Sequence, residues 1–263
     1  MSLTRRCTPS ADFSSSSVKP DIQVFDEPAQ LAQALADLFI DSARIAIAET
    51  GRFRVALAGG TTPRAAYELL SQEPRRDALF WRDVFIYFSD ERCVPLDDER
   101  SNYRMANTAF LSSINIPLGN VHRMRGEDEP QLAAGSYAKV LAADMGELPR
   151  FDLLMLGMGA DGHTASLFPG SSPAADDPLL VRAPFVPKLQ AYRLTLTPRV
   201  INNARYVVIA TEGPQKAAAL AAALDGPYDP NTYPVQIVNP RDGQLSWLID
   251  RDAASQLKRE RVS

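Results

Sequence analysis

Short apolar runs alternate with amphipathic stretches from Asp21 onward. Four of these runs, RVALA, VFIYF, DLLML and YVVIA, are apolar almost throughout, without the polar residue at every second position that a half-exposed strand carries. Such runs are typical of strands that are buried on both faces, as in a parallel sheet covered by helices. The pattern therefore predicts an α/β fold with one doubly wound, mostly parallel sheet and helices on both of its faces.

The same pattern predicts where each element lies along the chain. We expect strands at residues 22–25, 54–58, 84–88, 152–156, 193–197, 206–210, 235–238 and 245–248. We expect helices at residues 29–49, 63–70, 101–111, 131–144 and 214–224, and one more at the C-terminus. Ligands of doubly wound sheets bind at the carboxyl ends of the strands, so the loops after the apolar runs are the candidate functional segments.

The length and composition of the chain indicate how many domains it forms. The 263 residues exceed the usual length of one domain, but an α/β domain can reach this size. No repeat, low-complexity segment or linker interrupts residues 21–263, which we expect to form a single domain. Residues 1–20 contain Arg and Ser but lack the apolar core of a secretory signal, and we expect them to form a disordered leader.

Charge and residue counts narrow the possible partners. A net charge of −4 and a pI of about 5.3 argue against binding to nucleic acid, which needs a basic face. No apolar run is long enough to span a membrane. Two cysteines and two histidines leave no disulfide framework and no zinc cluster. We therefore expect a cytoplasmic protein without a metal, membrane or nucleic-acid partner. We also expect either a monomer or a weak homodimer, although these counts do not bear on the oligomeric state.

Two of the candidate loops open helices in a way that suits an anion. The segment GGTTPR combines glycines with Thr62, which can cap a helix, and Pro63, which suits a first helical position. The segment EGPQK places Lys216 in the first turn of a helix. Lys216 and Arg64 both face the positive end of a helix dipole, and an anion such as phosphate between them would relieve this mismatch.

The loop GMGADGHTASLFPG contains the candidate general base. Its glycines match the dinucleotide pattern GxGxxG, but Pro169 and Gly170 stop any helix within two turns, so we expect no nicotinamide or other cofactor. His163 lies near Asp161 in this loop. A neutral imidazole is the side chain best suited to accept a proton near pH 7.

The loop SDERCVP supplies further charged groups. Arg92 can bind an oxyanion, and Asp90 or Glu91 can orient a hydroxyl or a water. Asn102, near the start of the next helix, is another candidate for ligand binding. Because no GxSxG elbow is present and no Ser or Cys has a neighbouring base, a hydrolase built on these loops would use direct attack by water.

Taken in order, these loops resemble one enzyme family. LAGGTTPRAAYELL, DERCVP followed by SNYR, GMGADGHTASLFPG, and RLTLT, INNARYVV and EGPQKA occur in the order typical of the 6-phosphogluconolactonase family. The resemblance spans residues 22–247, with one mild departure at Thr61, where the family often has Ser. The related glucosamine-6-phosphate deaminases share the DGH but continue differently where this chain has TASLFPG.

The resemblance implies a Rossmann-like fold of the sugar-phosphate isomerase/deaminase type. It also implies hydrolysis of a phosphorylated sugar lactone, 6-phospho-D-glucono-1,5-lactone, to 6-phosphogluconate, the second step of the pentose phosphate pathway. The catalytic histidine of the family, its aspartate and the arginine of its DER motif fall on His163, Asp161 and Arg92. The phosphate- and substrate-binding positions fall on Gly60, Thr61, Thr62, Asp90, Asn102, Arg193 and Lys216.

Two other functions stay open at the level of the sequence. An amino-sugar-phosphate deaminase or isomerase on the same scaffold would use Asp90 to move a proton between sugar carbons. A sensor would bind the sugar phosphate without turning it over, and intact Asp161 and His163 argue against that function. Ammonia release and lactone turnover distinguish the three.

Overall fold

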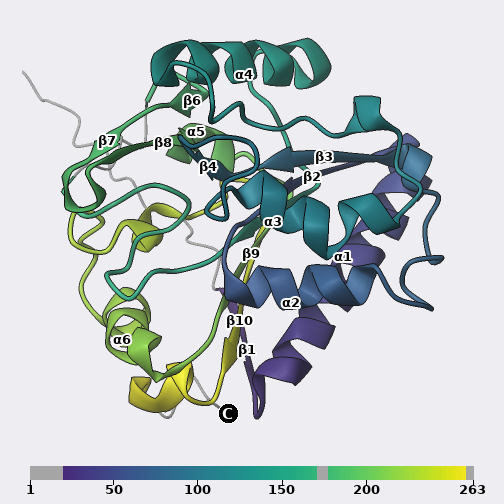
Figure 1. Cartoon of the computed structure of the whole chain (residues 1–263). Coiled ribbons are helices and arrows are strands. Elements are labelled where there is room, and N and C mark those ends of the chain that lie inside the picture. The colour runs from purple at the N-terminus through teal and green to yellow at the C-terminus, as the bar shows by residue number, and fades with distance from the viewer. Residues whose placement is uncertain (1–19, 171–176, 259–263) are drawn as a thin grey trace, which may run out of the picture.

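Six strands form a parallel sheet in the computed structural model of the protein, which describes residues 20–170 and 177–258 (Figure 1). They follow the order β1-β10-β9-β5-β2-β3, and every neighbouring pair is parallel. The strands are β1 (Asp21–Phe25), β2 (Phe53–Leu57), β3 (Val84–Phe88), β5 (Leu153–Leu156), β9 (Tyr206–Thr211) and β10 (Gln244–Asp250). The chain order reverses between β2 and β5, and such a reversal creates a crevice at the carboxyl ends of the strands.

Helices cover both faces of this sheet (Figure 1). Helices α1 (Pro28–Thr50) and α2 (Thr61–Leu70) lie on one side, and α4 (Pro130–Met145) and α6 (Ala217–Asp225) lie on the other. Helix α3 (Asn102–Ala109) packs beside α2, and the short α5 (Pro198–Ile201) precedes β9. The predicted doubly wound α/β fold is therefore confirmed.

The core lies between the sheet and these two layers. Phe39 of α1 meets Phe53 of β2 edge-on, with ring centroids 5.3 Å apart. On the opposite face, the backbone N–H of Phe88 in β3 donates to the hydroxyl of Tyr137 in α4 at 2.9 Å. Both faces of the central strands are thus covered, which explains why their sequences lack polar alternation. Within the residues described, no helix is both long and apolar enough to cross a membrane.

A second, smaller sheet was not foreseen from the sequence. It is antiparallel, with the order β4-β8-β6 and with β7 paired to β8. Its strands are β4 (Asp90–Arg92), β6 (Val181–Arg182), β7 (Phe185–Val186) and β8 (Ala191–Leu196). Only β8 had an expected counterpart, because strands of two or three residues are too short to show a period in the sequence. This sheet brings the segment after β3 next to β8.

Several expected elements are shorter or of another type. The strand expected at residues 235–238 is a 3₁₀ turn, Pro234–Ile237, whose buried Val235 and Ile237 gave the segment its apolar character. The helix expected at residues 214–224 begins as a 3₁₀ turn before α6. In place of the C-terminal helix, the described residues contain one 3₁₀ turn, and residues 259–263 lie outside them. The 3₁₀ turns are Trp81–Asp83, Leu111–Ser113, Leu118–Asn120, Pro187–Leu189, Pro214–Lys216, Pro234–Ile237 and Ala253–Gln256. Except for Pro20, the leader expected at residues 1–20 also lies outside the described residues.

Candidate active site

A cavity opens where the central strands of the parallel sheet end. Its volume is about 400 Å³, and residues that follow β2, β3, β5 and β9 line most of it. These strands are neighbours in the sheet, and the reversal of chain order lies among them. The cavity therefore occupies the position at which doubly wound sheets bind ligands.

The ten positions to which the family resemblance assigns a role all line this cavity. They come from the loops after four parallel strands, from the start of α3 and from the small antiparallel sheet. The lining includes Gly60, Thr61, Thr62, Asp90, Arg92, Asn102, Asp161, His163, Arg193 and Lys216. The fold thus brings the candidate base and the candidate phosphate-binding groups into one space, while the role of each residue stays a prediction.

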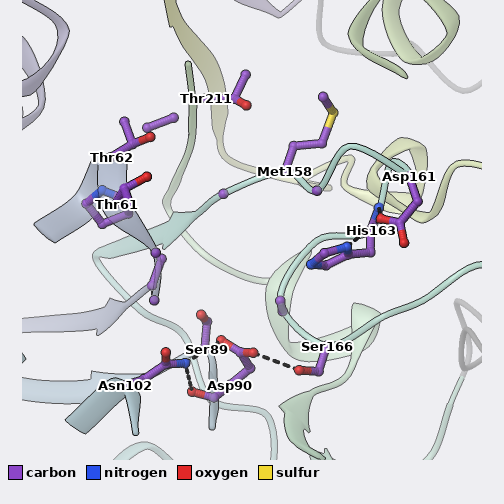
Figure 2. A pocket seen from close by; sticks show the side chains of 18 of the residues that line it. Thr61, Thr62, Ser89, Asp90, Asn102, Met158, Asp161, His163, Ser166 and Thr211 are labelled. Atoms are coloured by element: carbon purple, nitrogen blue, oxygen red, sulfur yellow. Dashed lines mark hydrogen bonds and ion pairs between the residues drawn. The ribbon is translucent and has the colours of Figure 1, made fainter. Parts of the chain in front are cut away.

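His163 and Asp161 form a hydrogen-bonded pair on one wall of the cavity. Nδ1 of His163 lies 2.5 Å from Oδ1 of Asp161. The ring of Phe168 stacks on the imidazole with a centroid separation of 4.4 Å. Figure 2 shows the imidazole pointing toward the middle of the cavity, with Asp161 on its outer side. Because the carboxylate holds Nδ1, Nε2 is the nitrogen left to exchange a proton with a ligand.

Asp161 stays ionised down to low pH. Burial raises its pKa, but the hydrogen bond and charge of His163 and the hydrogen bond from Lys188 outweigh burial and bring the pKa to about 2. Nζ of Lys188 donates to Oδ2 of Asp161 at 3.1 Å. An anionic Asp161 keeps the proton of the neutral imidazole on Nδ1, and it stabilises the imidazolium that forms when Nε2 accepts a second proton.

The loop that carries this pair closes on itself. The N–H of Gly159 donates to the carbonyl of His163 at 2.8 Å, and the N–H of Gly162 donates to the carbonyl of Gly159 at 3.0 Å. A Cβ at position 159 would lie 2.0 Å from Nδ1 of His163, so the imidazole packs directly on bare backbone. The segment with the GxGxxG pattern thus forms a tight turn around the histidine, and no helix begins in it.

Arg92 and Arg193 are brought side by side by the small antiparallel sheet. The register of β4 and β8 pairs them directly, and both line the cavity. Directly paired residues of antiparallel strands point to the same face, where two like charges repel each other. Burial lowers the pKa of Arg193, and the charge of Arg92 lowers it further. A phosphate or carboxylate group bound between the two guanidinium groups would remove this repulsion.

A buried carboxylate fixes the strand that carries Arg92. Glu91 is 2% exposed, and burial raises its pKa against the effect of its hydrogen bonds. Its carboxylate accepts hydrogen bonds from the hydroxyl of Ser101 and from the backbone N–H groups of Arg92, Asn102 and Tyr103. Glu91 thus ties β4 to the N-terminus of α3, where a negative charge is favoured. Of the two acids offered for a hydroxyl or a water, Asp90 lines the cavity and Glu91 supports the fold.

A second basic region lies between the loops after β2 and β9. Burial lowers the pKa of Lys216, and the charge of Asp161 opposes this change. Within the described part of the chain, Nζ of Lys216 has no hydrogen bond or ion pair. The first turn of α2 leaves the backbone N–H groups of Thr61 and Thr62 without an acceptor in the helix. A partly buried ammonium and a helix start together favour an anion.

Two expectations about the start of α2 are wrong. Arg64 lies outside the cavity, and its Nε donates to Glu68 at 2.8 Å one turn further along the helix surface. This i,i+4 pair offsets the mismatch with the helix dipole without any bound anion. The helix begins at Thr61, so Thr62 is no cap and Pro63 is not the first residue. The cap is Gly60, whose φ of +104° lies in a region that favours glycine.

Asp90 joins the loop of His163 to the strand of Arg92. Its Oδ1 accepts a hydrogen bond from Nδ2 of Asn102 at 3.1 Å, and its Oδ2 accepts one from the hydroxyl of Ser166 at 2.7 Å (Figure 2). Oδ1 of Asn102 is buried and lacks a hydrogen-bond partner among the described residues. Asp90 and Asn102 therefore hold the cavity floor in place and offer polar atoms to a ligand.

Several lining residues that contact the expected ones were missed, and Ser166, Phe168 and Lys188 are three of them. Ser166 and Phe168 belong to TASLFPG, which served only as a marker of the family resemblance. Lys188 lies in a 3₁₀ turn between β7 and β8. The sequence shows a lysine shortly before RLTLT, but its contact with Asp161 depends on tertiary packing that no local pattern reveals.

Other catalytic groups are poorly placed or poorly activated. Burial raises the pKa of the Cys93 thiol to about 11, which disfavours a thiolate nucleophile. His122 stacks on Tyr87 at 4.7 Å and is not part of the cavity wall. In the portion of the chain described, no three or more His, Cys, Asp or Glu side chains are grouped to hold a metal ion. The arrangement suits attack by water, assisted by His163, on a substrate that carries a phosphate.

Comparison with known proteins points to one family. The model of the family described as glucosamine-6-phosphate isomerases/6-phosphogluconolactonase matches residues 26–247. A 6-phosphogluconolactonase from Synechocystis is 39% identical over 218 residues, which cover 81% of this chain and 88% of that protein. A 6-phosphogluconolactonase from Nostoc is 35% identical over 249 residues, which cover 91% of this chain and 99% of that protein.

The fold agrees with a solved structure from the same group of proteins. The 6-phosphogluconolactonase from Trypanosoma brucei matches with a TM-score of 0.82 at 29% sequence identity. The match covers 92% of this chain and 100% of that one. The likeness thus extends over nearly the whole chain.

Proposed function

The chain belongs to the family of glucosamine-6-phosphate isomerases and 6-phosphogluconolactonases and is a 6-phosphogluconolactonase, and we propose that His163 is the general base of its reaction. The reaction is the hydrolysis of 6-phospho-D-glucono-1,5-lactone to 6-phosphogluconate in the pentose phosphate pathway. The observation that carries the proposal is the hydrogen-bonded pair of His163 and Asp161, which faces the same cavity as Arg193 and Lys216.

The proposed mechanism begins with a water between Nε2 of His163 and the carbonyl carbon of the lactone. Nε2 accepts one proton as the water oxygen bonds to the carbon, and Asp161 stabilises the imidazolium. The tetrahedral intermediate then collapses and the bond from carbon to the ring oxygen breaks. The imidazolium returns its proton to that oxygen, which leaves a hydroxyl and a carboxylic acid that ionises in water.

The proposed phosphate site consists of the Gly60–Thr62 turn, Arg193 and Lys216. The free N–H groups of a helix start and two partly buried cations support this assignment. The β4–β8 register places Arg92 beside Arg193, so we assign both guanidinium groups to the negative charge of the substrate and of its transition state. Asp90 and Asn102 are assigned to the ring hydroxyls, since both are polar, buried and part of the lining.

Replacement of Lys216 by alanine should weaken substrate binding. A hydrogen bond to a charged group contributes about 1.5–3 kcal/mol, so KM for the phosphorylated lactone should rise roughly 10- to 100-fold, with a smaller change in kcat. Initial rates over a range of lactone concentrations measure both constants. The matched control is Arg64→Ala, which removes a cation at the start of α2 but outside the cavity. An unchanged KM in Lys216→Ala would remove this lysine from the phosphate site.

The proposed substrate recognition is tested directly with two lactones. Freshly made 6-phosphogluconolactone and unphosphorylated gluconolactone are compared in a pH-stat, with enzyme at catalytic concentration and the spontaneous rate subtracted. We expect a much higher kcat/KM for the phosphorylated lactone. Binding without turnover would favour the sensor, and ammonia release from glucosamine 6-phosphate would favour the deaminase.

The other expectations from the sequence remain predictions. They are a single domain at residues 21–263, a disordered leader at residues 1–20, a monomer or weak homodimer, a cytoplasmic location, and no nucleic-acid or membrane partner. Gel filtration with light scattering tests the oligomeric state, and cell fractionation tests the location.

A further inference from the structure

Lys188 contacts the catalytic pair from outside the loop that carries it. It lies in the 3₁₀ turn Pro187–Leu189, between β7 and β8, and its side chain borders the cavity. Its Nζ donates to Oδ2 of Asp161 at 3.1 Å, while Oδ1 of the same carboxylate lies 2.5 Å from Nδ1 of His163. One carboxylate is therefore shared between an imidazole and an ammonium.

We propose that Lys188 is a positioning residue that, through its contact with Asp161, orients His163 and opposes protonation of its imidazole. The inference rests on the proposed role of His163 as the base. A carboxylate next to an imidazole favours the imidazolium, which has already taken up its proton and cannot act as a base. A second cation on the same carboxylate weakens that preference, and its charge repels the imidazolium directly.

The contact also holds Asp161 in place. Without Lys188, Oδ2 would have no hydrogen-bond partner among the described residues, because both of the other hydrogen bonds of this carboxylate, from the backbone and the ring of His163, go to Oδ1. The carboxylate would then be free to rotate toward solvent. Lys188 thus orients the group that keeps the proton of the imidazole on Nδ1.

Other charged side chains line the same cavity, but none of those described takes the place of Lys188 as the hydrogen-bond donor to Oδ2 of Asp161. The charged groups that line it with His163 are Asp90, Arg92, Asp161, Lys188, Arg193, Glu212 and Lys216. Asp90 is bonded to Asn102 and Ser166, and Glu212 accepts a hydrogen bond from Thr61. Arg92 donates to the carbonyl of Arg100. Among the residues described, Lys188 is the cation that bonds to Asp161, and it lies outside the proposed phosphate site.

The chain contains two histidines, His122 and His163, so their ring C–H signals can be followed separately in an NMR titration of the whole protein. In Lys188→Met, the titration midpoint of His163 should rise by about half a pH unit, a modest shift because solvent screens an exposed charge. Lys188→Arg should restore the original midpoint. The signal of His122, which lies outside the cavity, serves as an internal reference.

Kinetics provides the second measurement. For 6-phosphogluconolactone, kcat/KM falls as the pH is lowered. The pH at which this fall occurs should rise in Lys188→Met by the same amount as the titration midpoint of His163. The matched control is Lys139→Met, which removes an exposed lysine from α4. An unchanged or lower midpoint of His163 in Lys188→Met would overturn the inference. A raised KM for the phosphorylated lactone with an unchanged midpoint would also overturn it, because Lys188 would then bind phosphate.

Failure of this inference is distinguishable from failure of the proposed mechanism. The midpoints are measured on the free enzyme, without substrate. Loss of activity in His163→Ala together with an unchanged midpoint in Lys188→Met rejects the role of Lys188 alone. Retained activity in His163→Ala would show that His163 is not the general base. A shift of its titration midpoint in Lys188→Met would then have no bearing on catalysis.

Discussion

Replacing His163 by alanine is expected to lower kcat for 6-phosphogluconolactone by a factor of about 10²–10⁴, the usual contribution of a general base. KM should change much less, because the groups assigned to the phosphate are untouched. The side chain of His163 is 32% exposed and lies on the cavity wall, so its removal leaves no hole in the hydrophobic core. Initial rates in a pH-stat and a thermal unfolding curve measure the two effects.

Two further variants separate catalysis from structure. Asp161→Asn should lower kcat nearly as far, because a neutral amide does not stabilise the imidazolium or fix the proton on Nδ1. His122→Gln alters the other histidine, outside the cavity, and should leave kcat near the wild-type value. If His163→Ala kept nearly full turnover while remaining folded, water attack would not need the imidazole and the mechanism would be wrong.

The sequence predicted the parallel sheet well for a physical reason. A strand that is covered on both faces has few positions that tolerate a polar residue, so most of its length appears as an apolar run. The strand expected at residues 84–88 coincides with β3 (Val84–Phe88) for this reason. The sequence does not predict the short strands of the antiparallel sheet, and it predicts a strand at the 3₁₀ turn Pro234–Ile237. Segments of so few residues are too short to show either the helical or the strand period.

The cavity was predictable because parallel strands end at one edge of a sheet. The loops after β2, β3, β5 and β9 had to meet there, and the polar residues in them had to share a space. Arg64 was assigned wrongly because the argument from the helix dipole ignored Glu68, which is visible in the sequence one turn further on. Lys188 had no such signal, since a hairpin of very short strands sets its contact with Asp161.

Net charge says little about this site. The chain carries a net charge of −4, yet four cations line one cavity of about 400 Å³: Arg92, Lys188, Arg193 and Lys216. An overall acidic balance argues against a partner with an extended phosphate backbone, but a single phosphate needs only a local group of cations. The net charge of the chain therefore bears on extended nucleic-acid partners, whereas the cations in the cavity bear on the substrate.

A methyl group at position 159 is expected to disable the pair of His163 and Asp161 although neither of these residues is replaced. An ideal Cβ there would lie 2.0 Å from Nδ1 of His163 and 2.6 Å from Oδ1 of Asp161, distances that real atoms do not reach. The imidazole must therefore move, and the hydrogen bond to Asp161 must stretch or break. Since a misplacement of about 1 Å can reduce a rate about 100-fold, Gly159→Ala should lower kcat by about that factor.

The same loop offers a matched control. At Gly157, two residues earlier and also in the cavity lining, a Cβ would meet the carbonyl oxygen of Ala210 at 3.7 Å, an ordinary contact. Gly157→Ala should therefore keep a kcat close to that of the wild type, and both variants should unfold near the wild-type temperature, because neither methyl group enters the hydrophobic core. Equal and nearly normal kcat values in the two variants would show that catalysis does not depend on the observed position of the imidazole. A selective loss in Gly159→Ala would tie turnover to the geometry of His163 and Asp161, because the two substitutions add the same atoms to the same loop.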